Sequence, residues 1–461
     1  MKKKIALVNT PFIEVKDNHP LLPPLGLTYL AAVLEQDNHE IRVIDCPASN
    51  MNHEKLKKEL SAFGPDIVGI TSLTPTIESA FRSARMAKEA APNAQVVIGG
   101  PHATFLDKEV LSEEKAIDIV VRGEGEETLR EIAASNPLGK VAGVTFRGEE
   151  GQFVQTPNRT FIQDLDALPR PAYKYLNLEN YRLFGKLHMP IMASRGCLYQ
   201  CAFCVSSRMW GGRYRVRSPK SVAEELQWLR DEHGADGAQF HDDILTPDAK
   251  RIGDICDEII ARKTKLPWGC QARVDQISKE ILEKLRKACC NEVSYGIESG
   301  CQKILDAVHK KTSTEQNEQA IKMAKEAGLF VAVTVLIGYP GETKENVQET
   351  LDLLRRAEPD DIWLCIATPY PGTEMRMVLE NMGLKVSDNW NLYDTMHPVF
   401  DNPLLSGDDI KQIRNGFYNE LYSPKYVLRQ TVKGYVKGNY FSQIMARTAL
   451  NHILWRVRSA L

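Results

Sequence analysis

Three cysteines share one short segment of the chain, where Cys197, Cys201 and Cys204 follow the pattern Cys-x3-Cys-x2-Cys. The segment comes directly after a predicted strand at residues 189–194, so we expect a loop held by a sheet. Random placement of ten cysteines in 461 residues rarely gives this spacing. In a chain of this length, clustered cysteines indicate metal ligation or catalysis rather than a disulfide framework.

The ligands of this loop favour iron over zinc. Zinc sites in proteins commonly complete their ligand set with a fourth thiolate, a His or an acidic residue, and no His stands within the loop. Three thiolates suit a 4Fe–4S cluster whose fourth iron stays open to a substrate or cofactor. The remaining cysteines fall in apolar strand or helix patterns and are interpreted as small core residues; they are Cys46, Cys256, Cys270, Cys289, Cys290, Cys301 and Cys365.

The elements that must position this loop form a regular series. Predicted strands lie at residues 189–194, 237–242, 268–273, 293–297, 330–336 and 361–367, with helices at 221–233, 249–263, 279–288 and 314–327. Six strand–helix units are too few for a closed eight-stranded barrel, so the series predicts an open, partial one.

Polar residues and glycine follow several of these strands. Together with the three-cysteine loop, their order along residues 187–375 resembles the radical S-adenosylmethionine (SAM) superfamily. Each motif alone has a local explanation as a helix cap or a turn. The resemblance implies that the open iron chelates SAM and that an electron donor such as ferredoxin or flavodoxin drives its reductive cleavage. It also implies SAM contacts from Phe203, Asp242, Asp243, Arg273, Glu298, Ser299 and Gly338.

The first 130 or so residues form a second strand–helix series. Predicted strands lie at residues 4–9, 40–45, 66–71, 95–100 and 117–122, with helices at 26–36, 53–63, 78–90 and 107–113. This alternation predicts a doubly wound, Rossmann-like α/β sheet with a ligand crevice at the carboxyl ends of its strands. The first strand is followed by Asn9-Thr10-Pro11-Phe12 rather than by Gly-x-Gly-x-x-Gly, which argues against a dinucleotide.

The residues after these strands resemble the cobalamin-binding domain that precedes one class of radical SAM enzymes. Small residues there let the backbone approach a corrin ring and its nucleotide tail closely. The cobalt-ligating pattern Asp-x-His-x-x-Gly is incomplete, because Leu22 and Arg42 replace its glycine after His19 and His39. The resemblance therefore implies cobalamin without a protein imidazole on cobalt, His102 on the nucleotide side, and contacts from Thr71, Ser72, Thr74, Gly99, Gly100, His102, Gly123 and Glu124.

Composition and patterning complete the predicted organisation. We expect a cobalamin-binding domain at residues 1–140, a linker with a hairpin near 148–151 at 141–185, the partial barrel at 186–375, and a mostly helical region at 376–461. That last region either covers the substrate cavity or packs on the barrel. A net charge of −2 argues against nucleic acid as a partner, and no apolar run is long enough to span a membrane, so a cytoplasmic protein is expected.

Two fused cofactor domains predict a methyltransferase. The resemblance implies that a 5′-deoxyadenosyl radical activates an unactivated carbon, to which methylcobalamin delivers the methyl group. The acceptor is a small molecule or a protein or peptide, and no acid or base for catalysis is assigned. One alternative is a cyclase or C–C coupling enzyme of tetrapyrrole or lipid biosynthesis, which has the same cofactor motifs. The other is a non-catalytic cobalamin or nucleotide sensor, against which the intact cysteine triad argues.

Overall fold

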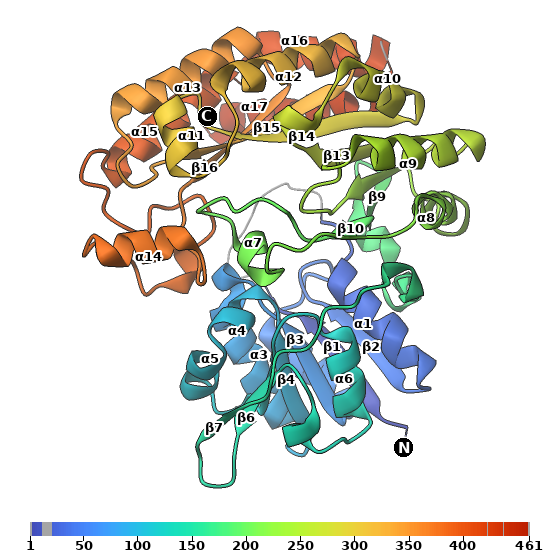
Figure 1. The fold of residues 1–461 in the computed structure, drawn as a ribbon. Helices are drawn as coiled ribbons and strands as arrows, with labels where there is room; N and C mark the ends of the chain where they lie inside the picture. The colour runs from blue at the N-terminus through green and yellow to red at the C-terminus, as the bar shows by residue number, and fades with distance from the viewer. Residues whose placement is uncertain (1, 12–20, 422, 437, 460–461) are drawn as a thin grey trace.

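Two sheets, one from each half of the chain, face each other across the middle of the molecule (Figure 1). The computed structural model describes residues 2–11, 21–421, 423–436 and 438–459. The sequence pattern Asp17-x-His19 lies outside these residues. Within them, no helix is both long enough and apolar enough to cross a membrane.

The first sheet is confirmed as a doubly wound α/β sheet. Helices α1 (Leu25–Gln36) and α6 (Glu126–Ala133) cover one face, and α2 (His53–Phe63), α3 (Ile77–Ala90), α4 (Pro101–Phe105) and α5 (Asp107–Glu113) pack on the other. The order β2-β1-β3-β4-β5 reverses between β1 and β3, where such sheets bind ligands. The parallel strands are β1 (Lys4–Asn9), β2 (Glu40–Asp45), β3 (Ile67–Thr71), β4 (Gln95–Gly99) and β5 (Ile119–Val121).

The predicted hairpin near residues 148–151 is confirmed and extends this sheet. Strands β6 (Val144–Arg147) and β7 (Phe153–Gln155) add to its β5 side in antiparallel pairing. Both strands come from the segment that the sequence assigned to the linker.

The second sheet is a curled, open half-barrel. Its strands β9 (Lys186–Ile191), β12 (Gly237–Phe240), β13 (Trp268–Ala272), β14 (Cys290–Glu298), β15 (Phe330–Ile337) and β16 (Asp361–Ile366) run parallel in that order. The short β8 (Arg182–Leu183) pairs antiparallel with β9. Alternate residues such as Val293, Tyr295 and Ile297 join the largest core, to which the covering helices α8 (Pro219–His233), α9 (Ala249–Ala261), α10 (Lys279–Lys287), α12 (Thr314–Glu326) and α13 (Lys344–Ala357) contribute.

The strand predicted at residues 189–194 is misplaced by about three residues. Strand β9 ends at Ile191, and the backbone N–H of Ala193 donates to the Asp242 carboxylate instead of to a strand. Residues Ser194 and Arg195 then form β10, which pairs with β11 (Arg215–Val216) in a separate two-stranded ribbon.

The C-terminal region packs on the half-barrel. It contains α14 (Glu374–Asn381), α15 (Gly407–Leu421), α16 (Pro424–Thr431) and α17 (Tyr440–Ser459). Tyr440 and Phe441 form a small core with Phe330 and Ala332 of β15. The Tyr418 hydroxyl accepts a hydrogen bond from the backbone N–H of Leu364 at 3.0 Å. Of the two alternatives for this region, these contacts support packing on the barrel.

Candidate active site between the two sheets

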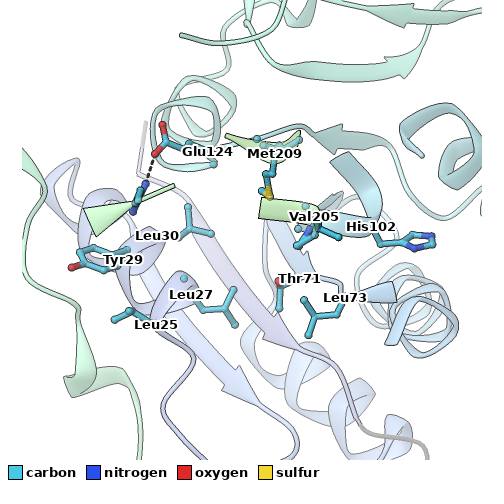
Figure 2. A pocket seen from close by; sticks show the side chains of 18 of the residues that line it. Leu25, Leu27, Tyr29, Leu30, Thr71, Leu73, His102, Glu124, Val205 and Met209 are labelled. Carbon is cyan, nitrogen blue, oxygen red and sulfur yellow. Dashed lines mark hydrogen bonds and ion pairs between the residues drawn. The ribbon is translucent and has the colours of Figure 1, made fainter. Parts of the chain in front are cut away.

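A cavity of about 610 Å³ lies between the carboxyl ends of the first sheet and the segment that follows Cys204. Thr71, Gly99 and Gly123 line it from the first sheet, and Val205 and Met209 line it from the second half of the chain. Figure 2 shows Leu27, Leu30 and Leu73 gathered around the same space. One apolar chamber therefore contacts both predicted cofactor regions.

Most residues predicted to contact cobalamin line this cavity. Ser72 does not line it, because its buried hydroxyl donates to the backbone oxygen of Gly99 at 3.2 Å. Gly123 has a φ of +74°, and a side chain there would point into open space. The lining residues are Thr71, Thr74, Gly99, Gly100, His102, Gly123 and Glu124.

The cavity also has an apolar wall, made by leucines that the predicted set of cobalamin contacts did not include. Leu25, Leu27 and Leu30 come from the first turns of α1, and Leu73 from the loop after β3. Leu73 is 53% exposed although it is apolar, which is typical of a surface that a ligand covers. Small residues at the strand ends together with a broad apolar wall fit the face of a large ring such as a corrin.

His102 lies at the margin of the cavity. Its buried ring packs edge-on against Trp390 with centroids 5.1 Å apart, and its Nδ1 is 3.3 Å from the Thr74 hydroxyl. In Figure 2 the ring points away from Leu27 and Leu30. Burial lowers the pKa of His102 to about 4, so the ring is neutral at physiological pH.

The cysteine loop is tied to the half-barrel at several points. The backbone N–H of Ala202 donates to the oxygen of Val308 at 3.0 Å, and the oxygen of Ala202 accepts from Met375 at 2.9 Å. Gly196, which opens the loop, has a φ of +97°, and a Cβ there would collide with the backbone oxygen of Arg213. Only glycine fits this start of the loop.

Asp243 braces the cysteine loop from both sides. One carboxylate oxygen accepts from the backbone N–H of Gly196 at 3.2 Å, and the other accepts from the Ser206 hydroxyl. Asp243 also lines the cavity. Its neighbour Asp242 is 2% exposed and is bonded to Ala193 and Ser194, and burial raises its pKa to about 6. The two adjacent carboxylates therefore have different surroundings.

The three thiols suit a cluster in which each thiolate binds a different iron atom. All are free; Cys201 is buried, and Cys197 and Cys204 are partly exposed. Burial raises the pKa of Cys201 to about 11, while Lys310 and Arg273 favour the thiolate that iron needs. Among the described residues, no three His, Cys, Asp or Glu side chains converge on a position for one metal ion. Three free thiols on one short loop are a donor set that fits a 4Fe–4S cluster.

Two cations lie close to the loop. Arg273 is buried, pairs with Asp275 at 2.9 Å, donates to the oxygen of Lys310 at 2.8 Å, and lies 3.5 Å from the centre of the Tyr199 ring. Glu298 pairs with the Lys310 ammonium at 2.7 Å, and both side chains are 8% exposed. Lys310 was missed by the sequence motifs, because it lies beyond α11 (Gln302–Ala307), the helix that follows Glu298.

The remaining predicted SAM contacts are engaged with the protein. Ser299 is fully buried, and its hydroxyl lies 3.0 Å from that of Thr350. Gly338 has a φ of +84°, and its N–H donates to Glu342. Phe203 packs against a satellite core beside the cysteine loop. Phe203 is part of the cysteine loop itself, and none of these three residues lines the cavity of about 610 Å³.

Comparisons with known proteins agree with this two-part site. A family model described as B12 binding domain matches residues 19–133, and one described as Radical SAM superfamily matches residues 191–354. The uncharacterized methyltransferase PH0819 of Pyrococcus horikoshii is 34% identical over 412 residues, covering 88% of this chain and 89% of that protein. The chain belongs to the cobalamin-dependent radical SAM enzymes. It is an enzyme of this class, with cobalamin, a 4Fe–4S cluster and SAM as cofactors.

Other relatives match a similar share of this chain or all of it. The anaerobic magnesium-protoporphyrin IX monomethyl ester cyclase of Cereibacter sphaeroides is 32% identical over 428 residues, covering 89% of this chain and 69% of the cyclase. The structure of the radical SAM methyltransferase TsrM from Kitasatospora setae, with cobalamin and a [4Fe-4S] cluster bound, has a TM-score of 0.77. It covers 100% of both chains at 19% identity. That similarity confirms the fold.

Proposed function

We propose that this enzyme transfers a methyl group from cobalamin to an unactivated carbon of its substrate. The observation that carries the proposal is the shared cavity, which Thr71 and Gly123 border on one side and Val205 and Met209 on the other. A reaction that uses both cofactors on one substrate needs a common space from which water can be excluded.

The bound cofactors would supply a 5′-deoxyadenosyl radical from SAM and the cluster, and a methyl group from cobalamin. A second SAM would restore methylcobalamin and leave as S-adenosylhomocysteine. The chain's own residues hold and orient these groups. We propose that Cys197, Cys201 and Cys204 ligate the cluster and that Asp243 keeps their loop in place. Arg273, Glu298 and Gly338 are proposed to bind SAM, with Phe203, Asp242 and Ser299 supporting that site from within the fold.

The substrate is proposed to be a small molecule or a peptide. An external one-electron donor such as ferredoxin or flavodoxin is proposed to reduce the cluster, and a reducing cytoplasm fits the ten cysteines, all of them free in the structure. Nucleic acid is not proposed as a partner, because the net charge is −2.

Ring closure is the second candidate function. It is favoured by the 32% identity to the magnesium-protoporphyrin ester cyclase over 89% of this chain. A cyclase and a methyltransferase of this class differ in what they do to the substrate radical, so the cofactor sites support both.

The test is anaerobic reconstitution with iron, sulfide and cobalamin, followed by SAM, reductant and quantification of 5′-deoxyadenosine and S-adenosylhomocysteine. We expect both products, with S-adenosylhomocysteine dependent on cobalamin. Deoxyadenosine without S-adenosylhomocysteine would favour the cyclase. If neither product forms while the cluster and cobalamin remain bound, both catalytic proposals are contradicted.

A further inference from the structure

Four charged side chains are buried together where the two halves of the molecule meet. Arg195 donates from Nη1 to Glu124 Oε1 at 2.7 Å and from Nη2 to Glu126 Oε1 at 2.6 Å. Arg215 donates from Nη1 to both carboxylate oxygens of Glu124, at 2.9 and 3.0 Å. None of these four side chains is more than 10% exposed. The group has no net charge.

The two arginines form the base of the cysteine loop. They are directly paired across the ribbon of β10 and β11, and the loop with the three cysteines runs between these two strands. The two glutamates belong to the other half of the chain. Glu124 lies in the turn after β5, and Glu126 lies in the first turn of α6. The ionic contacts therefore join the base of the cluster loop to the first sheet.

The arrangement holds the loop in a defined position. Two arginines side by side repel each other unless carboxylates lie between them. Buried ion pairs require near-ideal geometry, and removal of one partner strands a charge in the interior. The backbone N–H of Ile162 also donates to Glu124, at 2.8 Å, so both oxygens of this carboxylate are engaged. A purely apolar contact would permit sliding that these directional bonds resist.

The same residues border the cavity. Glu124, Glu126 and Arg195 all line it, within the region assigned to cobalamin. We propose that the four buried charges, Arg195, Arg215, Glu124 and Glu126, set the separation between the cluster and cobalamin. Arg195 is the principal positioning residue. The inference rests on the proposed cofactor sites, and it assigns to Glu124 a role at the interface beyond contact with cobalamin.

Spectroscopy of the loaded protein tests the proposal without turnover. With the cluster reduced and cobalamin as cob(II)alamin, both are paramagnetic, so relaxation of the cob(II)alamin EPR signal reports their separation. Arg195→Gln should weaken the relaxation enhancement, and Arg195→Lys should restore it only in part, because lysine lacks the planar fork. The matched control is Arg130→Gln, which breaks a bidentate pair with Asp37 at 2.8 Å, 34% exposed on each side.

Turnover gives a second readout. Misplacement of reacting groups by about 1 Å can cost about 100-fold in rate, so Arg195→Gln should raise the ratio of deoxyadenosine to methylated product by about tenfold or more. Unchanged relaxation and an unchanged ratio in a variant that keeps both cofactors would overturn the inference. If the wild type makes no methylated product, the EPR comparison still decides the positioning role. Should Arg195→Gln fail to fold, Glu126→Gln removes one arm only and is measured in the same way.

Discussion

The carboxyl ends of the two sheets carry different residues. At the first sheet they are small or apolar, with Thr71, Gly99 and Gly123 beside a wall of leucines. At the second sheet, Arg273 and Glu298 are buried ions that need partners such as Asp275 and Lys310. The first sheet end provides space for a large ring. The second sheet end presents buried charges instead.

The two sheet ends differ in the property that a substitution would disturb. Bulk at the first sheet end is excluded by backbone geometry, as at Gly100. Buried ion pairs near this end include the contacts of Glu124 and Glu126 and the pair of Arg122 with Asp107 at 3.6 Å. At the second sheet end, a neutral substitution leaves a partner charge without compensation. The two ends should therefore respond differently to mutation.

The largest effect is expected at the cysteine loop. Cys201→Ala removes a cluster ligand and should abolish deoxyadenosine formation, measured by chromatography after anaerobic reconstitution. Cys46→Ala is the matched control, because Cys46 is also buried but lies in the first domain, outside the cluster loop. Cleavage of SAM at the wild-type rate by the Cys201 variant would contradict the cluster assignment.

At the first sheet end, backbone space is the critical property. Gly100 has a φ of +106°, and a Cβ there would collide with the backbone oxygen of Ser72. Gly100→Ala should cost about 1–3 kcal/mol in strain and displace the cobalamin-side turn, lowering bound cobalamin in absorbance titrations. Gly64→Ala is the control, since Gly64 has a φ of +63° but open space around it. Equal cobalamin content in both variants would place the corrin elsewhere.

At the second sheet end, charge is the critical property. Lys310→Met leaves Glu298 buried without its cation and should lower the free energy of unfolding by about 3–5 kcal/mol in urea titrations. Lys250→Met removes the partner of Asp254 on the surface, where the side chains are 84% and 44% exposed, so the free energy of unfolding should change much less than in Lys310→Met. Similar losses in the free energy of unfolding of the two variants would show that Glu298 does not depend on its buried ion pair.

Strand and helix positions were readable where burial repeats along the chain. Residues 53–63 have helical spacing of apolar side chains, and the helix begins and ends where this spacing predicted. The strand at residues 4–9 is a continuous apolar run, and it also begins and ends where the sequence predicted. By contrast, α4 was not predicted, because a five-residue helix carries too little periodicity.

Tertiary partners were not readable from the motifs. Arg195 meets Glu124 across 71 residues, and nothing in either local sequence specifies the other. Leu25 and Leu73 also line one cavity although 48 residues separate them, and the predicted set of cobalamin contacts included neither. The sequence indicated which residues carry chemistry, and the fold determined which of them face the cavity and which hold it together.

A smaller effect concerns the titration of Asp242. Burial raises its pKa from about 3.8 to about 6, so between these values the folded state keeps a proton that the unfolded state releases. The free energy of unfolding should therefore fall as pH rises through this window, by up to about 3 kcal/mol, and stay low above it. Asp242→Asn should flatten this part of the pH profile in urea titrations. Asp408→Asn, at a side chain that is 90% exposed, should leave the slope as in the wild type.

The smallest effect is expected at Thr71, and it sharpens the comparison most directly. Its hydroxyl lines the cavity and has no hydrogen-bond partner among the residues that the structure describes, so Thr71→Val keeps shape and strand propensity. Stability should change by less than about 1 kcal/mol and cobalamin affinity by less than about fivefold. At the second sheet end, Ser299→Ala breaks contacts with Thr350 at 3.0 Å and with the N–H of Cys301 at 3.1 Å, and should cost about 1–3 kcal/mol. Both changes remove one hydroxyl. A larger loss of stability from Thr71→Val than from Ser299→Ala would reverse the contrast between the two sheet ends. A loss of cobalamin affinity well above fivefold would show that cobalamin is held there by polar contacts rather than by space.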